Sequence, residues 1–160
     1  MAATAYIGIG ANLGDAVASV QSAIARLSTL RATRLRAQSS LFRTAPVEAG
    51  GADYVNAVAC IETALDAPEL LVALQTIENE FGRERPYQNA PRTLDLDILL
   101  FGRDQIDTDI LTVPHPRLTQ RAFALIPLLQ IDPLISIPGK GPAHSFVPDV
   151  AGQAIARIKA

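Results

Sequence analysis

Two hydrophobic periodicities alternate along this sequence, and their order limits the folds that are open to it. Apolar residues at every second position indicate strands, and apolar residues at spacings of three and four indicate helices. The segments with a strand pattern are residues 4–10, 34–43, 54–63 and 91–102. The segments with a helix pattern are residues 15–30 and 68–81. The chain therefore runs strand, helix, strand, strand, helix, strand.

This order predicts an α+β fold with a ferredoxin-like βαββαβ core and an antiparallel sheet. Asp15 is suited to cap the first helix, Pro68 to start the second and Gly82 to end it. An additional C-terminal helix is expected over residues 117–130, followed by a Pro/Gly-rich tail, residues 132–148.

Length and charge narrow the class of protein. The chain has 160 residues, a formal net charge of -2 and hydrophobic residues at 49%, which predicts a single globular domain over residues 1–160. It has no Lys/Arg tract that would indicate a nucleic acid or a membrane surface as partner. The amino terminus has neither a signal-peptide pattern nor a membrane span, and the single Cys60 cannot form an internal disulfide. We therefore expect a cytoplasmic monomer with small-molecule partners.

The stretch PRTLDLDILLFG, residues 91–102, places two acids in an otherwise apolar strand. Asp95 and Asp97 share one face, because successive strand side chains point to opposite sides. At roughly 6 to 7 Å their charges would repel by about 2.5 kcal/mol at an effective dielectric of about 20. The pair is either a solvated face with arginine partners or a divalent metal site. Mg²⁺ usually takes one or two carboxylates and leaves its other positions to water and phosphate oxygens.

Three arginines precede this strand in the loop GRERPYQNAPR: Arg83, Arg85 and Arg92. They either pair with neighbouring acids in a solvated loop or bind phosphate, since guanidinium groups form bidentate bonds with phosphate. His115 lies between two prolines in VPHPRL, where a histidine is often a turn or capping group. Nearby Arg117 and Arg121 favour a role for His115 as a hydrogen-bond donor to phosphate.

Glycines and aromatic residues supply two further patterns. GIGANLGD, residues 8–15, has Leu13 where a G-x-G-x-x-G loop needs glycine, so we expect its glycines to shape a tight turn. Tyr54 and Asn56 share one strand face, and Phe123 lies on the late helix. These residues are either core or a stacking and hydrogen-bonding site for a heteroaromatic ring.

Several segments together resemble the 6-hydroxymethyl-7,8-dihydropterin pyrophosphokinases of folate biosynthesis. They are YIGIGANLGD, LFRTAP, DYVNA, QTIENEFGRER, APRTLDLDILLFG, LTVPHPRL and QRAFAL, and they cover residues 5 to about 130. The resemblance implies a ferredoxin-like fold and transfer of the β,γ-diphosphoryl group of ATP to the pterin hydroxymethyl oxygen, with release of AMP. It also implies Mg²⁺ as cofactor, with two ions.

The resemblance also assigns roles to residues. Asp95 and Asp97 would hold the two Mg²⁺ ions between the pterin hydroxyl and the ATP phosphates. The implied catalytic residues are Arg83, Arg92, Asp95 and Asp97. The implied ATP-binding residues are Gln75, Glu78, Arg85, Ile98, Thr112, His115 and Arg121, with the backbone at Ile98 and Thr112 meeting adenine. The implied pterin-binding residues are Thr44, Val47, Tyr54, Asn56 and Phe123, with Tyr54 and Phe123 sandwiching the ring.

Two departures from the family pattern concern loops. Gln88, Asn89 and Ala90 stand where members often carry Arg-Trp-Gly, and Pro116 follows His115 where an aromatic residue is frequent. We expect altered loop closure with the chemistry retained. Two other interpretations are a non-catalytic ferredoxin-like binding module and a metal-dependent phosphohydrolase, which would pass phosphate to water and would not need the aromatic site.

Overall fold

The computed structural model describes residues 2–12, 15–44, 53–82 and 94–158. It confirms the predicted α+β fold and the order of its core elements. These are β1 (Ala3–Ala11), α1 (Ala16–Leu27), β2 (Thr33–Gln38), β4 (Tyr54–Thr63), α2 (Ala67–Phe81) and β5 (Asp95–Phe101). Two short strands, β3 (Phe42–Thr44) and β10 (Ile155–Arg157), extend the sheet.

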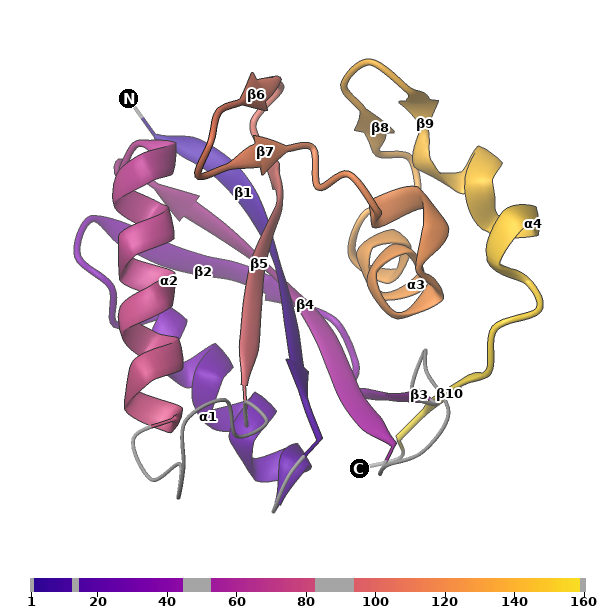
Figure 1. Ribbon diagram of the computed structural model, residues 1–160, viewed down its shortest axis with the longest axis horizontal. Coiled ribbons are helices and arrows are strands. Elements are labelled where there is room, and N and C mark those ends of the chain that lie inside the picture. The colour runs from indigo at the N-terminus through magenta and orange to yellow at the C-terminus, as the bar shows by residue number, and fades with distance from the viewer. Residues whose placement is uncertain (1, 13–14, 45–52, 83–93, 159–160) are drawn as a thin grey trace.

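The sheet is antiparallel at every described pairing. Its strands follow the order β10, β3, β4, β1 and β5, and β2 also pairs with β4. Strands β1 and β4 therefore form the centre, and β5 lies at one edge. Figure 1 shows helix α2 and the later helix α3 (Ala122–Ile131) on opposite sides of these strands.

Local sequence signals set the start of α1 and the end of α2 as predicted. Asp15 caps α1 by accepting the Ala18 N–H, and α2 begins with a capping box in which Asp66 and Glu69 each accept the other's backbone N–H. Gly82 follows α2, as expected. The expected extension of the first helix to residue 30 is wrong, because α1 ends earlier and a turn follows.

Each face of the sheet has its own core. Alternate residues of β4 point to opposite faces, so Val55, Ala57 and Ile61 pack in the cluster that includes α1 and α2. Val58 and Cys60 pack on the other face with apolar residues of α3. The second face carries the functional site, at the end where α3 begins.

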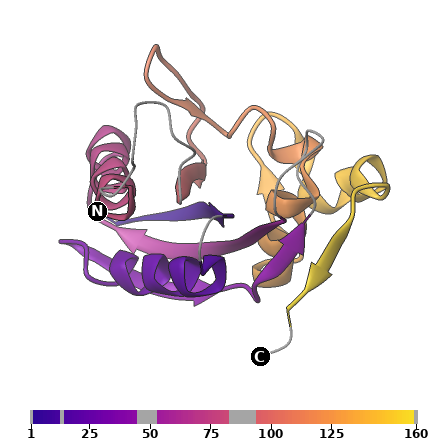
Figure 2. The same cartoon turned by 60° about the horizontal axis from the view of Figure 1, so that its bottom comes forward.

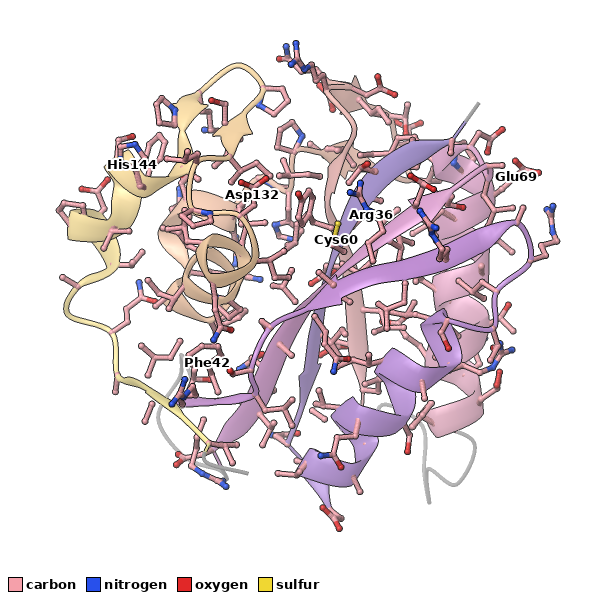
Figure 3. All side chains as sticks on the ribbon, turned by 180° about the vertical axis from the view of Figure 1, so that it is seen from behind. Arg36, Phe42, Cys60, Glu69, Asp132 and His144 are labelled. Atoms are coloured by element: carbon pink, nitrogen blue, oxygen red, sulfur yellow. The ribbon has the colours of Figure 1, made fainter. Side chains whose placement is uncertain are left out.

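Cys60 is a buried residue. Burial raises the pKa of its thiol, which the nearby Tyr6 hydroxyl and Arg36 oppose. Figure 3, which views the molecule from behind, labels Cys60 together with Arg36 and Asp132. A buried thiol with a raised pKa is a poor nucleophile, so Cys60 fits a structural role.

The expected continuous strand over residues 34–43 is wrong, because β2 and β3 are separate strands. Both pair with β4, and Ser39 lies between them. The Ser39 N–H donates to the Val58 carbonyl at 2.8 Å, and the Ser39 hydroxyl accepts the Val58 N–H at 2.9 Å. A side-chain oxygen thus replaces a backbone carbonyl in the ladder, and the strand can break there without leaving Val58 unpaired.

The expected helix over residues 117–130 is also divided. A 3₁₀ helix, η1 (Leu118–Gln120), precedes α3, and Arg121 between them is extended, with φ -125° and ψ 112°. None of the described helices is long and apolar enough to cross a membrane.

The remaining elements are short and come late in the chain. They are β6 (Ile106–Asp107), β7 (Thr112–Val113), β8 (Ser136–Ile137), β9 (Gly141–Pro142), η2 (Ala143–Phe146) and α4 (Val147–Val150). The Pro/Gly-rich tail therefore has more structure than its composition indicated. Beyond residue 148 the chain continues through α4 and Gln153 to β10, which runs beside β3 (Figure 2). Residues 132–158 together are called the tail.

Candidate active site

A cavity of about 990 Å³ brings together side chains that are far apart in the sequence. Its floor comes from β1, β4 and β5, and its wall comes from η1, the start of α3 and the tail. Eight residues predicted for the site line this one cavity: Thr44, Tyr54, Asn56, Asp95, Asp97, His115, Arg121 and Phe123. The structure thus joins the predicted acids, aromatic residues and cations.

Two glycines of β1 form the floor between the acids and Asn56. Gly10 pairs with Asn56 on one side and Asp95 on the other, and Gly8 pairs with Asp97. For Gly8 and Gly10 the expected tight turn is wrong, because both lie inside a strand, while Gly14 of the same segment falls outside the described residues. Since paired residues share a face, the missing side chains leave the space over this part of β1 to the side chains of Leu99 and Asn56.

Asn56 is held firmly beside this floor. Its Nδ2 donates a 2.7 Å hydrogen bond to Thr44 Oγ1, and both side chains are buried. A Cβ placed on Gly10 would lie 2.8 Å from Asn56 Oδ1. The amide oxygen therefore reaches over Gly10, where it can accept a hydrogen bond from a ligand ring.

Asp95 and Asp97 lie on β5, and their side chains are exposed to the cavity. The N–H of Leu96 between them donates to the Glu78 carboxylate of α2 at 2.8 Å. In the described part of the chain no strand pairs with the outer side of β5. The Glu78 carboxylate therefore accepts the Leu96 N–H in place of a neighbouring strand. This contact fixes the segment that carries both acids.

His115 lies beside Asp97, with 4.0 Å between its Nε2 and Asp97 Oδ2. The backbone N–H of His115 donates to the Leu99 carbonyl at 3.0 Å. The imidazole Nδ1 of His115 accepts the backbone N–H of Arg117 at 3.1 Å. Burial lowers the pKa of His115, and Arg121 and Arg117 lower it further, while Asp97 opposes them. The imidazole is therefore neutral at pH 7, and its proton is assigned to Nε2, which faces the acid.

Arg121 and Phe123 form part of the cavity wall. The Arg121 guanidinium carbon lies 5.3 Å from the centroid of the Phe123 ring, which is a cation–π contact. Tyr54 lines the same cavity from β4. The wall thus offers an aromatic face next to a fixed positive charge.

The donor set at the acids suits a metal that is only partly coordinated by protein. Within the described ranges, no group of three or more His, Cys, Asp or Glu side chains is placed to hold a metal ion. Two exposed carboxylates above a glycine floor leave room for water and phosphate oxygens. This is the usual ligand set of Mg²⁺, so the residues present fit such an ion.

Other residues predicted for the site lie apart from this cavity. Gln75 is exposed on α2, the Ile98 side chain of β5 is buried in the core with α1 and α2, and Thr112 lines a second cavity of about 340 Å³. Four more fall outside the described residues: Val47, Arg83, Arg85 and Arg92.

Sequence analysis missed other residues of the cavity. The alternation of Gly8 and Gly10 was a signal that could have been used. Alternate glycines in a strand leave one face without side chains, just as alternate aspartates place charge on one face. Gln153 and Ala154 line the cavity from the tail. No local sequence pattern predicts that these two residues belong to the site, because their position depends on how the tail returns to the sheet.

Comparisons with known proteins agree on one family. The family model described as 7,8-dihydro-6-hydroxymethylpterin-pyrophosphokinase (HPPK) matches residues 6–133. The 2-amino-4-hydroxy-6-hydroxymethyldihydropteridine pyrophosphokinase of Bacillus subtilis (strain 168) is 44% identical over 128 residues, which are 79% of this chain and 77% of the relative. The enzyme of that name from Haemophilus influenzae is 45% identical over 129 residues, which are 80% of this chain and 81% of the relative.

Solved structures agree in fold. A crystal structure of Plasmodium falciparum HPPK-DHPS A437G with pteroate has a TM-score of 0.76 at 12% identity and covers 100% of this chain. This chain spans only 47% of that longer chain, and at this identity the likeness shows the fold alone. The family match over residues 6–133 and the two bacterial relatives show that the chain belongs to the 7,8-dihydro-6-hydroxymethylpterin-pyrophosphokinase family, whose reaction is pyrophosphoryl transfer to hydroxymethyldihydropterin in folate biosynthesis.

Proposed function

We propose that this enzyme transfers the β,γ-diphosphoryl group of ATP to 6-hydroxymethyl-7,8-dihydropterin and releases AMP. One observation carries the proposal: a single cavity joins the aspartates of β5, across a glycine floor, to the Asn56–Thr44 pair and the Arg121–Phe123 wall. A ring-binding end and a charged end therefore share one space.

The ring-binding end suits the pterin. Phe123 and Tyr54 offer aromatic faces for stacking, and Asn56 Oδ1 offers an acceptor for a ring N–H. Because the bond to Thr44 holds the Asn56 carboxamide, this acceptor is positioned before the ligand arrives. Val47 belongs to the same proposed set.

The charged end suits the phosphates. Arg121 supplies a permanent positive charge, and neutral His115 directs an N–H into the cavity. Arg83, Arg85 and Arg92 add to this charge in the proposal. The ATP-side set also includes Gln75 and Glu78, with the backbone at Ile98 and Thr112 for adenine.

Asp95 and Asp97 would hold Mg²⁺, with two ions proposed. When bound, Mg²⁺ neutralises phosphate charge and acidifies a hydroxyl that it contacts. The remaining contribution of the protein is positioning and electrostatic stabilisation. In the transfer, the hydroxymethyl oxygen bonds to the β-phosphorus, the bond from that phosphorus to the α,β-bridging oxygen breaks, and AMP leaves with that oxygen. The hydroxyl proton passes to solvent, and we infer no dedicated general base.

The proposal further includes a single domain over residues 1–160 that acts as a cytoplasmic monomer without nucleic-acid or membrane partners. These expectations follow from the length, charge and composition of the chain.

Product analysis tests the proposal. Purified protein is incubated with ATP, Mg²⁺ and 6-hydroxymethyl-7,8-dihydropterin, and AMP, ADP and pterin diphosphate are separated, with a control that lacks the pterin. We expect AMP and pterin diphosphate in equal amounts, and only when the pterin and Mg²⁺ are both present. ADP with free phosphate, formed with or without pterin, would indicate the phosphohydrolase instead. Pterin binding without any turnover would indicate the binding module.

A further inference from the structure

Arg121 occupies a junction between two helices. It is the only residue between η1 and α3, and its backbone is extended while the neighbouring residues are helical. The directions of the Arg121 and Phe123 side chains therefore depend on how η1 and α3 meet. Both side chains line the active-site cavity.

The junction lacks a cap from its own sequence. Arg121 stands at the N-cap position of α3 and makes no side-chain cap bond. A guanidinium has donors only, so it cannot accept the free N–H groups of a first helical turn. Pro127 in α3 also cannot donate the usual bond to the Phe123 carbonyl.

Gln153 from the tail bonds the backbone on both sides of Arg121. Its Oε1 accepts the Ala122 N–H at 2.9 Å, and its Nε2 donates to the Gln120 carbonyl at 2.8 Å. These two backbone groups belong to the residues immediately before and after Arg121. One carboxamide thus joins the last residue of η1 to the first residue of α3.

The tail holds Gln153 from both directions. The Gln153 N–H donates to the Val150 carbonyl at 3.0 Å, at the end of α4. Two residues later, Ile155 of β10 pairs with Thr44, the partner of Asn56. The segment from Gln153 to Ile155 therefore connects the Arg121–Phe123 wall to the Asn56–Thr44 pair.

We propose that Gln153 is a positioning residue, whose carboxamide holds the η1–α3 junction so that Arg121 and Phe123 keep their places at the cavity. It lies outside the part of the chain that the family model matches, residues 6–133. The inference rests on the proposed roles of Arg121 at ATP and Phe123 at the pterin.

The test compares Gln153, which bonds the first residue of α3, with Gln130, which lies near the other end of that helix. Gln130 also makes two bonds with its carboxamide, accepting the Ser40 N–H at 2.6 Å and donating to Ser40 Oγ at 2.8 Å. Gln130 does not line the cavity, so Gln130→Met is the matched control for Gln153→Met. Methionine keeps similar bulk but makes neither amide bond.

We expect Gln153→Met to raise the KM for the pterin about tenfold, because the ring-binding wall loses its fixed direction. Gln130→Met should keep the wild-type KM within about twofold. Thermal unfolding of both variants separates this effect from a loss of stability, since a merely structural role would lower the Tm of both and leave the KM unchanged. An unchanged KM in Gln153→Met, or an equal rise in both variants, would overturn the proposal.

Amide hydrogen exchange gives a second readout that needs no turnover. We expect the Ala122 N–H to be protected in the unaltered protein and in Gln130→Met, and to exchange faster in Gln153→Met. If Gln153→Met does not fold, the unaltered protein still decides, because an unprotected Ala122 N–H would refute the bond. If the unaltered protein makes no pterin diphosphate, the proposed function fails, while the exchange comparison still tests the junction.

Discussion

The absence of a side chain at Gly10 determines how Asn56 is placed. A Cβ at Gly10 would lie 2.8 Å from Asn56 Oδ1, and the bond to Thr44 restrains Asn56 from moving away. We expect Gly10→Ala to raise the KM for the pterin by about tenfold or more. Gly8→Ala is the control, because the nearest atoms to its Cβ would belong to the Leu99 side chain, at 3.3 Å, and not to Asn56. A similar KM for both variants would show that the floor at Gly10 does not position Asn56.

Asp97 should be needed for turnover and dispensable for folding. Its side chain is about half exposed, so Asp97→Ala leaves no buried charge or cavity behind. We expect kcat to fall by more than about a hundredfold, with little change in Tm. Asp109→Ala, at an exposed acid that lines neither cavity, should keep wild-type activity. Near-normal activity in Asp97→Ala would refute the metal assignment.

At the scale of residues, the sequence predicted the acids better than their surroundings. The alternation of Asp95 and Asp97 in an apolar segment was enough to place both on one strand face, as the structure confirms. Gly8 and Gly10 were assigned to a turn, because a glycine pattern alone does not show whether a strand continues through it. The pairing partners on β4 and β5 settle that question, and they come from distant parts of the chain.

Helix α2 provides a prediction at the scale of an element. Glu69, labelled in Figure 3, accepts the Asp66 N–H at 2.9 Å and pairs with Arg31 at 3.2 Å. The Asp66 N–H and then Arg31 lower the pKa of Glu69, so its contribution to stability is present above the ordinary glutamate pKa, about 4.3, and is lost as the pH falls through the lowered folded value.

We therefore expect Glu69→Ala to lower the Tm most at neutral pH, and the difference from wild type to shrink below about pH 4. Thermal unfolding across this range checks it. Glu62→Ala, which removes an exposed pair with Arg34 but no helix cap, is the control. A Tm difference in Glu69→Ala that does not change with pH would show that the carboxylate charge is not responsible.

Elements were predictable where their signals are local. The start of α1 and the end of α2 follow from Asp15 and Gly82, which act within one turn of the chain. The break between β2 and β3 was not predictable, because it depends on Ser39 bonding Val58 nineteen residues away in sequence. Strand β10 was missed for the same reason, since its partner β3 lies more than a hundred residues earlier.

For the whole molecule, ligand binding should stabilise the fold only when the metal is present. A ligand that binds the folded state alone adds about 2.7 kcal/mol at a concentration about 100 times its Kd. We expect ATP with Mg²⁺ to raise the Tm, and a chelator to abolish the rise. Asp97→Ala should show no Mg²⁺-dependent rise either. An equal rise with ATP alone would contradict the proposed role of Asp95 and Asp97.

The return of the tail to β3 has a consequence for the order in which the molecule is made. A ribosome releases the βαββαβ core, which ends at Phe101, well before it releases β10 and Gln153. Domains can begin to fold while synthesis continues, so the sheet and its two helices can assemble first. The wall around the cavity is synthesised last, so a nascent chain can assemble this core before it has its complete substrate site.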